Sequence, residues 1–201
     1  MFDARIRALI DPPLNRLGFG LARRGITADA ITLAGLILGL AAALAIALGT
    51  PGWALIPLLA SRLMDGLDGA VARATRKTDF GGYLDIWCDF IFYGAIPFAF
   101  AFLDPANAVP AAFLLLTFYV NGTSFLGYAI MAEKRRIETT AQGQKSLYYS
   151  AGLLEGSETI AFFVLICLLP EHFAILAWVF GGLCLFTATA RVLNARHLLS
   201  D

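Results

Sequence analysis

The sequence of 201 residues has few charged side chains and no excess of either sign. Asp, Glu, Lys and Arg make up 15% of the chain, and fifteen basic residues balance fifteen acidic ones. An ordinary soluble protein carries about 25% charged residues. Because 59% of this chain is apolar, it fits neither a disordered segment nor an ordinary soluble domain. Without a basic excess, a nucleic-acid partner is not expected.

Cysteine and histidine are also scarce. Cys88, Cys167 and Cys184 lie in apolar runs and show no Cys-x-x-Cys spacing, which argues against a disulfide framework and a thiolate metal site. We expect all three to be small, buried apolar residues. His172 and His197 stand alone, and we assign neither a catalytic or metal-binding role.

Long apolar runs fill most of the chain. A helix needs about 20 apolar residues to cross a bilayer, and six runs qualify, separated by short breaks that contain Pro and Gly. They cover residues 31–49, 53–72, 80–102, 109–131, 147–169 and 173–193. The sequence therefore predicts an all-α integral membrane protein, with a six-helix transmembrane bundle in a domain that spans residues 29–201.

Residues 1–28 are expected to form a separate juxtamembrane segment. The segment holds five arginines and two prolines but no apolar core, so a cleavable signal peptide is not expected. Apolar residues recur in it at helical spacing with basic residues opposite, namely Phe2, Ile6, Leu9 and Ile10 against Arg5 and Arg7. This pattern predicts an amphipathic helix that lies on the membrane surface.

The basic residues are distributed unevenly along the chain. Fourteen of the fifteen lie in the first 28 residues, in the loops after the second and fourth runs, and near the C-terminus. The three intervening loops contain none. Since loops rich in Lys and Arg stay in the cytoplasm, both termini are expected on the cytoplasmic side.

Four aspartates interrupt the second and third runs. Asp65 and Asp68 are three residues apart, and Asp85 and Asp89 are four apart, so each pair lies on one face of its helix. In an antiparallel hairpin of the two helices, Asp68 lies level with Asp85 and Asp65 with Asp89. Charged side chains inside membrane helices cost about 2.5 to 3.5 kcal/mol each and therefore mark candidate functional sites.

Four carboxylates in one interhelical gap repel one another unless cations neutralise them. Two divalent cations would balance the four charges, and carboxylate oxygens favour Mg²⁺ or Mn²⁺, with Ca²⁺ as a non-productive occupant. Such a pair of ions holds a diphosphate and stabilises its displacement. The alternative is structural salt bridges with the nearby cations Arg62, Arg73, Arg76 and Lys77. Salt bridges alone do not require two pairs of aspartates that lie level with each other across the gap.

The acids belong to a longer motif that small residues complete. Asp-x-x-Asp-Gly-x-x-Ala-Arg is followed by Gly-x-x-x-Asp-x-x-x-Asp, and the fixed positions are Asp65, Asp68, Gly69, Ala72, Arg73, Gly81, Asp85 and Asp89. This stretch resembles the signature of the class I CDP-alcohol phosphotransferase superfamily. Seven residues separate Arg73 from Gly81, one fewer than in the familiar pattern. We expect the turn at 74–80 to absorb the difference without moving either helix.

The resemblance implies a phospholipid-synthesising enzyme of the bacterial inner membrane, with its active site on the cytoplasmic side. It implies transfer of a phosphatidyl group from a CDP-linked lipid, CDP-diacylglycerol, to the hydroxyl of a small alcohol, with release of CMP. It assigns the four aspartates to the two divalent cations and makes Asp89 the general base as well. It places five residues at the nucleotide: Asp68, Gly69, Ala72, Arg73 and Gly81. A homodimer is also implied.

The acceptor alcohol is expected in a second pocket formed by the later helices. Cations there would suit a phosphorylated acceptor such as glycerol 3-phosphate or another polyol phosphate. The candidate residues are Lys145, Arg191 and Arg135, with Glu158 orienting these cations or contacting an amine-bearing acceptor. Basic residues in the loops are also expected from the rule that Lys and Arg remain in the cytoplasm, without any ligand. Serine or another non-phosphorylated alcohol is the alternative acceptor.

Acids in Gly-rich membrane helices are also typical of cation-coupled transporters. Such transporters usually contain internal repeats, whereas the aspartate pattern occurs once in this sequence. A transporter and a purely structural membrane protein are the alternatives from other functional classes.

Overall fold

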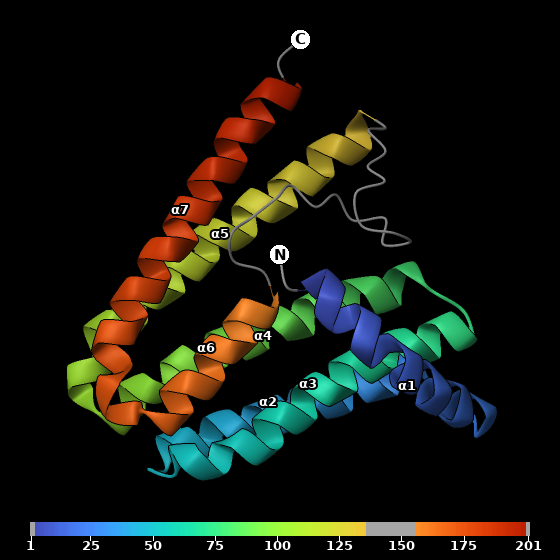
Figure 1. Ribbon diagram of the computed structural model, residues 1–201, viewed down its shortest axis with the longest axis horizontal. Helices are drawn as coiled ribbons and strands as arrows, with labels where there is room; N and C mark the ends of the chain where they lie inside the picture. The colour runs from blue at the N-terminus through green and yellow to red at the C-terminus, as the bar shows by residue number, and fades with distance from the viewer. Residues whose placement is uncertain (1–2, 136–155, 200–201) are drawn as a thin grey trace.

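The computed structural model describes residues 3–135 and 156–199, and this part of the chain is all-α, without strands. The helices are α1 (Asp3–Arg23), α2 (Ala28–Ala47), α3 (Pro51–Ala74), α4 (Asp79–Leu103), α5 (Ala108–Lys134), α6 (Gly156–Leu168) and α7 (Phe173–Leu199). Single turns of 3-10 helix, η1 (Pro105–Asn107) and η2 (Pro170–His172), precede α5 and α7. The helical bundle expected from the composition is confirmed (Figure 1).

Short polar breaks fix where the apolar helices begin. Thr27 caps α2 by accepting a hydrogen bond from the Ala30 N–H at 3.3 Å, and Thr78 caps α4 by accepting from the Gly81 N–H at 3.0 Å. These hydroxyls satisfy N–H groups that the first turn of a helix leaves unpaired. Between α2 and α3, Gly49 has a φ of +84°, a left-handed conformation that glycine adopts without steric cost.

Four segments in the described part of the chain are long and apolar enough to cross a membrane: α2, α4, α5 together with η1, and α7 together with η2. At 24 residues α3 has sufficient length, but charged residues interrupt its apolar face. The described part of α6 has 13 residues, and the expected start of this span near residue 147 lies outside the described residues. The count of six spans therefore stays a prediction for α3 and α6.

The packing of the helices leaves a space between α3 and α4. α2 lies against both of them, α4 packs against α5, and α5 and α7 run side by side (Figure 1). Aromatic rings join α4, α6 and α7, since Phe100 stacks on Phe173 with centroids 4.4 Å apart and Phe162 stacks on Phe180 at 4.1 Å. These rings belong to the main hydrophobic core, which includes Leu58 of α3 and Phe100 of α4. The core therefore lies at the ends of α3 and α4 that are distant from the turn at 75–78. The aspartates lie between the core and this turn.

The expected N-terminal helix is present as α1 and packs against α3. Leu14 is buried against this helix, in a small apolar cluster with Val71. A Cβ on Gly18 would lie 2.7 Å from the Ala70 Cβ, so the two backbones approach closely at this glycine. The apolar side chains of Leu17 and Phe19 are exposed, as expected of a helix that contacts the membrane surface.

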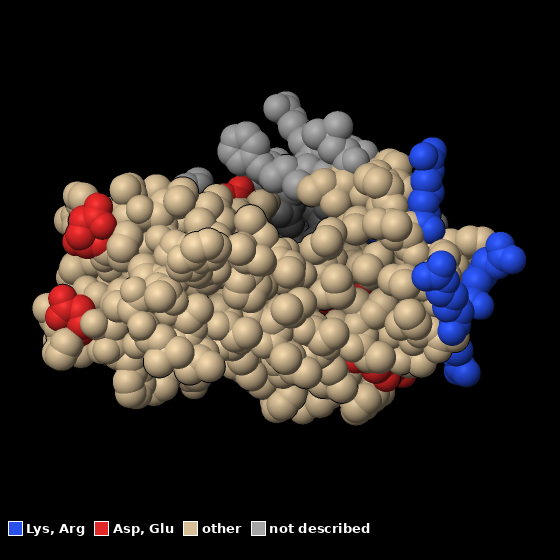
Figure 2. Space-filling model, turned by 90° about the horizontal axis from the view of Figure 1, so that it is seen from below, with Lys and Arg blue, Asp and Glu red and all other residues tan. Residues whose placement is uncertain are grey.

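Lys and Arg side chains gather at one end of the face shown in Figure 2. Acidic side chains occupy the other end, and a few also lie near the basic end. Along the chain, Arg24 and Arg76 lie in the turns before α2 and α4, whereas Asp104 and Glu171 lie in the loops before α5 and α7. This polarity is the one that the charge distribution of the sequence predicts. Which end faces the cytoplasm stays a prediction.

Candidate metal centre and nucleotide site

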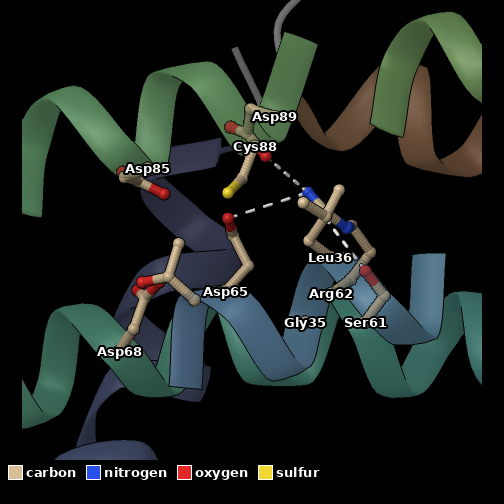
Figure 3. A pocket seen from close by; sticks show the side chains of 10 residues that line it. Gly35, Leu36, Ser61, Arg62, Asp65, Asp68, Asp85, Cys88 and Asp89 are labelled. Carbon is tan, nitrogen blue, oxygen red and sulfur yellow. Dashed lines mark hydrogen bonds and ion pairs between the residues drawn. The ribbon is translucent and has the colours of Figure 1, made fainter. Parts of the chain in front are cut away.

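One cavity is lined by all four aspartates. Asp65 and Asp68 project from α3, and Asp85 and Asp89 project from α4 across the space between the two helices (Figure 3). α2, which packs against both, contributes Thr32 and the small Gly35 to the wall, among other residues. The spacings of three and four residues put each pair of carboxylates on one helix face, so both pairs point into the same cavity.

Three of these carboxylates come within reach of one cation. Asp65, Asp85 and Asp89 each offer an oxygen, and the three oxygens lie within 4.8 Å of one another. Opposed ligands around Mg²⁺ lie about 4.2 Å apart, so the spacing of these oxygens is close to that of ligands around a single ion. The donors are oxygens alone, which suits Mg²⁺, Mn²⁺ or Ca²⁺. The residues present therefore fit the expected divalent cations.

Asp68 is held apart from this trio by a hydroxyl of α2. Thr32 Oγ1 donates to Asp68 Oδ2 at 2.6 Å, and both side chains are buried. Asp68 still lines the cavity that holds the trio. Thr32 was not among the residues expected from the sequence. In the sequence, Thr32 is visible only as a polar residue within an apolar run. A threonine in a helix can also bond to the backbone of its own helix, and Thr32 does contact the Ala28 carbonyl at 3.1 Å.

Arg62 occupies one side of the cavity. Its Nη1 donates to Asp89 Oδ1 at 2.8 Å and lies 3.7 Å from Asp65 Oδ1. Arg73, Arg76 and Lys77, in contrast, form no ion pair with the four aspartates in the described part of the chain. Of the four basic residues considered from the sequence as salt-bridge partners, only Arg62 pairs with the aspartates in the described part of the chain.

The expected nucleotide residues lie on the α3 and α4 segments next to the acids. Gly69 leaves space beside Arg73, since a Cβ there would lie 3.3 Å from Arg73 Nη1. The Arg73 guanidinium is exposed and donates twice to Asn15 Oδ1 of α1, at 3.1 and 2.8 Å. Ala72 is half-buried beside it. Arg73 is therefore oriented by a helix that the motif does not contain, and Asn15 was not among the residues expected from the sequence.

Gly81 lies in a tightly packed position at the start of α4. A Cβ there would lie 2.9 Å from Thr78 Oγ1, the group that caps the helix, and 3.1 Å from Asp29 Oδ1 of α2. Glycine at this position thus permits α2 to approach the first turn of α4. The turn between α3 and α4 spans residues 75–78, so both helices reach their expected ends despite the shorter spacing.

The expected acceptor residues fall on different helices. Arg191 of α7 is buried and donates to Asn121 Oδ1 at 2.9 Å and Ser124 Oγ at 2.7 Å, both on α5. Arg135 lies exposed at the end of α5, and Glu158 is half-buried in the first turn of α6. Lys145 lies outside the described residues.

The three cysteines are buried in the helices, as expected.

The helical bundle and the acidic cavity define a class of membrane proteins that hold oxygen-ligated divalent cations between helices. Residues 25–190 match the profile of the CDP-alcohol phosphatidyltransferase family, and the chain belongs to this family. The resemblance seen in the motif is thereby confirmed over most of the sequence. Membership favours a transferase over a transporter.

Curated relatives include proteins from bacteria and archaea. The Escherichia coli K12 inner membrane protein YnjF is 45% identical over 193 residues, which cover 96% of this chain and 94% of that protein. The archaetidylinositol phosphate synthase of Pyrococcus horikoshii is 38% identical over 99 residues, or 49% of this chain and 53% of the synthase.

Solved structures of the phosphatidylinositol phosphate synthase PgsA1 from Mycobacterium tuberculosis share the fold. The structure with CDP-DAG bound has a TM-score of 0.74 at 21% identity and covers 91% of this chain and 93% of that one. The complex with manganese and citrate has a TM-score of 0.73 at 22% identity and covers 90% of this chain and 88% of that one.

Proposed function

We propose that this protein transfers the phosphatidyl group of CDP-diacylglycerol, or a similar CDP-linked lipid, to the hydroxyl of a polyol phosphate and releases CMP. The observation that carries the proposal is the convergence of Asp65, Asp85 and Asp89 on one point between α3 and α4. The family provides the reaction class. The PgsA1 complexes with CDP-DAG and with manganese support the lipid and the metal.

The aspartates supply the binding and proton-transfer groups of the reaction. In this proposal Asp65, Asp68, Asp85 and Asp89 hold two Mg²⁺ or Mn²⁺ ions, which would neutralise the diphosphate of the lipid donor. Asp89 accepts the proton of the acceptor hydroxyl, whose oxygen forms a bond to the phosphorus that carries the diacylglycerol. The bond from this phosphorus to the bridging oxygen breaks, and CMP leaves with the electron pair.

The nucleotide is proposed to bind at the turn between α3 and α4, with the acyl chains remaining in the lipid. Gly69, Ala72 and Arg73 border it on α3, and Gly81 borders it on α4. Arg73 offers a fixed positive charge because Asn15 holds its guanidinium. The similarity to YnjF supports a place in a bacterial inner membrane. A cytoplasmic active site and a homodimer belong to the same proposal.

Arg191 supports a phosphorylated acceptor over serine. It is a buried cation on α7 beside a hydroxyl and an amide of α5, and this combination suits a phosphate group. Relatives that are named as synthases of inositol phosphate lipids support the same acceptor class. The proposal is a polyol phosphate, such as inositol phosphate or glycerol 3-phosphate.

The proposal is tested by release of CMP from CDP-diacylglycerol by the purified protein with Mg²⁺ or Mn²⁺. The acceptor panel contains glycerol 3-phosphate, inositol phosphate, inositol and serine. We expect turnover with one of the phosphorylated acceptors. Asp89→Asn is expected to lower kcat by about 100-fold or more, because a positioned base contributes about 10² to 10⁴.

Asp104→Asn is the matched control, since Asp104 lies at the other end of α4 and caps η1, a role that Asn fulfils. It should turn over like the unmodified protein. Near-normal kcat in Asp89→Asn would remove this residue as the base. Absence of CMP release with every acceptor, together with ion flux in vesicles, would favour the transporter.

A further inference from the structure

Arg62 is a cation built into the side of the acidic cavity that lies farthest from the turn at 75–78. Its guanidinium lies to one side of Asp65 and Asp89 and contacts both (Figure 3), 2.8 Å from the Asp89 oxygen and 3.7 Å from the Asp65 oxygen. These are two of the three carboxylates that converge on one point. Arg62 therefore competes for the same charges that a divalent cation would neutralise.

Three helices hold the guanidinium in this position. The fully buried Phe92 of α4 lies under it, with 3.9 Å from Cζ to the ring centroid, and the buried Ser61 of α3 accepts a hydrogen bond from Nη2 at 3.1 Å. Gly39 of α2 makes room for both, because a Cβ there would lie 2.6 Å from the Phe92 ring and 3.1 Å from Ser61 Oγ. Only 10% of the Arg62 side chain is exposed. These contacts fix the Arg62 guanidinium beside Asp65 and Asp89.

The charge of Arg62 changes the net charge that an incoming cation or anion encounters in the cavity. Among the described residues that line the cavity, four are aspartates and one is an arginine. Arg62 therefore offsets one of the negative charges that would balance two divalent cations. The second cation meets less negative charge with Arg62 present than it would without it. Because charges interact more strongly in a partly buried site than in water, Arg62 opposes the second cation unless an anion arrives with it.

We propose that Arg62 couples binding of the second divalent cation to binding of the nucleotide diphosphate. This inference rests on the proposed metal site. Arg62 makes the second cation bind weakly to the protein alone, and the diphosphate restores the affinity by supplying negative charge. Because linkage is reciprocal, the cation raises the affinity for the diphosphate by the same factor. The site thus assembles with its substrate rather than filling with metal beforehand.

The test is a titration of the full chain in lipid nanodiscs with Mn²⁺, with and without CDP, in which the EPR signal reports free Mn²⁺. In the unmodified protein we expect CDP to tighten the weaker Mn²⁺ step by about tenfold or more, within the usual range of coupling between sites. In Arg62→Gln this step should be tight without CDP, and the effect of CDP should fall below about threefold.

Two further variants control for charge and position. Arg62→Lys keeps the charge and should keep the coupling. Arg24→Gln removes an exposed cation from the turn before α2 and should bind Mn²⁺ and CDP like the unmodified protein. Ser61→Ala, which removes the hydrogen bond to Nη2, should reduce the coupling partially.

Coupling in Arg62→Gln equal to that of the unmodified protein would overturn the inference and leave the metal site intact. Failure of the unmodified protein to bind Mn²⁺ at all would instead overturn the proposed function. If Arg62→Gln does not fold, Ser61→Ala decides, and unchanged coupling in that variant rejects the inference.

Discussion

Thr32 shows how a single hydroxyl from a third helix directs a carboxylate of the candidate metal site. Its bond to Asp68 is short, at 2.6 Å, and buried. Carboxylates that bind metals are usually themselves hydrogen-bonded, and the partner fixes which oxygen faces the ion. In this arrangement Thr32 occupies one oxygen of Asp68. Thr32 is therefore a positioning residue in the proposed site.

Thr32→Val removes this hydroxyl and keeps the shape of the side chain. We expect Mn²⁺ affinity to fall by about tenfold, because loss of such an outer partner costs about 10- to 100-fold in metal affinity or activity. Titration with Mn²⁺ measures the change. Thr32→Ser restores the hydroxyl and should bind Mn²⁺ nearly as tightly as the unmodified protein. Equal affinity in Thr32→Val and Thr32→Ser would show that the bond does not position Asp68.

The four aspartates could be found from the sequence, but their partners could not. Acids in apolar runs stand out because burial of charge is costly, and their spacing determines the helix face. Thr32 and Arg62 reach Asp68 and Asp89 across 36 and 27 residues of sequence, so their contacts depend on how three helices are rotated and packed. The expected level pairs treat α3 and α4 as a two-helix hairpin. In the structure α2 packs against both and holds Asp68.

At the scale of elements, α1 packs against the part of α3 that carries the aspartate motif. It packs on α3 at the same turns that carry the motif, through Leu14 and Gly18. Asn15, between these two contacts, holds the Arg73 guanidinium. The sequence predicted an amphipathic helix from its periodicity, but its docking on α3 depends on a close approach at Gly18 that periodicity does not reveal.

Gly18→Ala tests this docking. The new Cβ would lie 2.7 Å from the Ala70 Cβ, so α1 must shift away from α3. We expect the free energy of unfolding to fall by about 1 to 3 kcal/mol, as for other overpacked contacts, and thermal unfolding in detergent measures it. Gly20→Ala is the matched control, because nothing lies within 4 Å of its Cβ. Equal melting temperatures for the two variants would contradict the close contact.

The overall architecture was largely predictable because it depends on two properties averaged over many residues, the apolar runs and the distribution of basic residues. Apolar runs set the helices, and the breaks between them set the turns, so α2, α3, α4, α5 and α7 overlap the expected spans. Basic residues gathered at one end of the bundle follow from the same pattern (Figure 2). The way α2 packs against both α3 and α4 was not predictable, because hydropathy does not determine which apolar faces meet.

The charge asymmetry also predicts how the whole molecule lies in the membrane. Because Lys and Arg remain in the cytoplasm, the turn that contains Arg24 should face the cytoplasm, and the loop that contains Asp104 should face the other side. Single cysteines at these exposed positions, Arg24→Cys and Asp104→Cys, report the side through a membrane-impermeant maleimide. The native cysteines are buried and should add little background. Asp104→Cys should react from outside intact spheroplasts, whereas Arg24→Cys should react only in inverted vesicles. Labelling in the opposite sense would place the acidic cavity near the outer surface, where a cytoplasmic CDP-lipid donor and acceptor do not meet it.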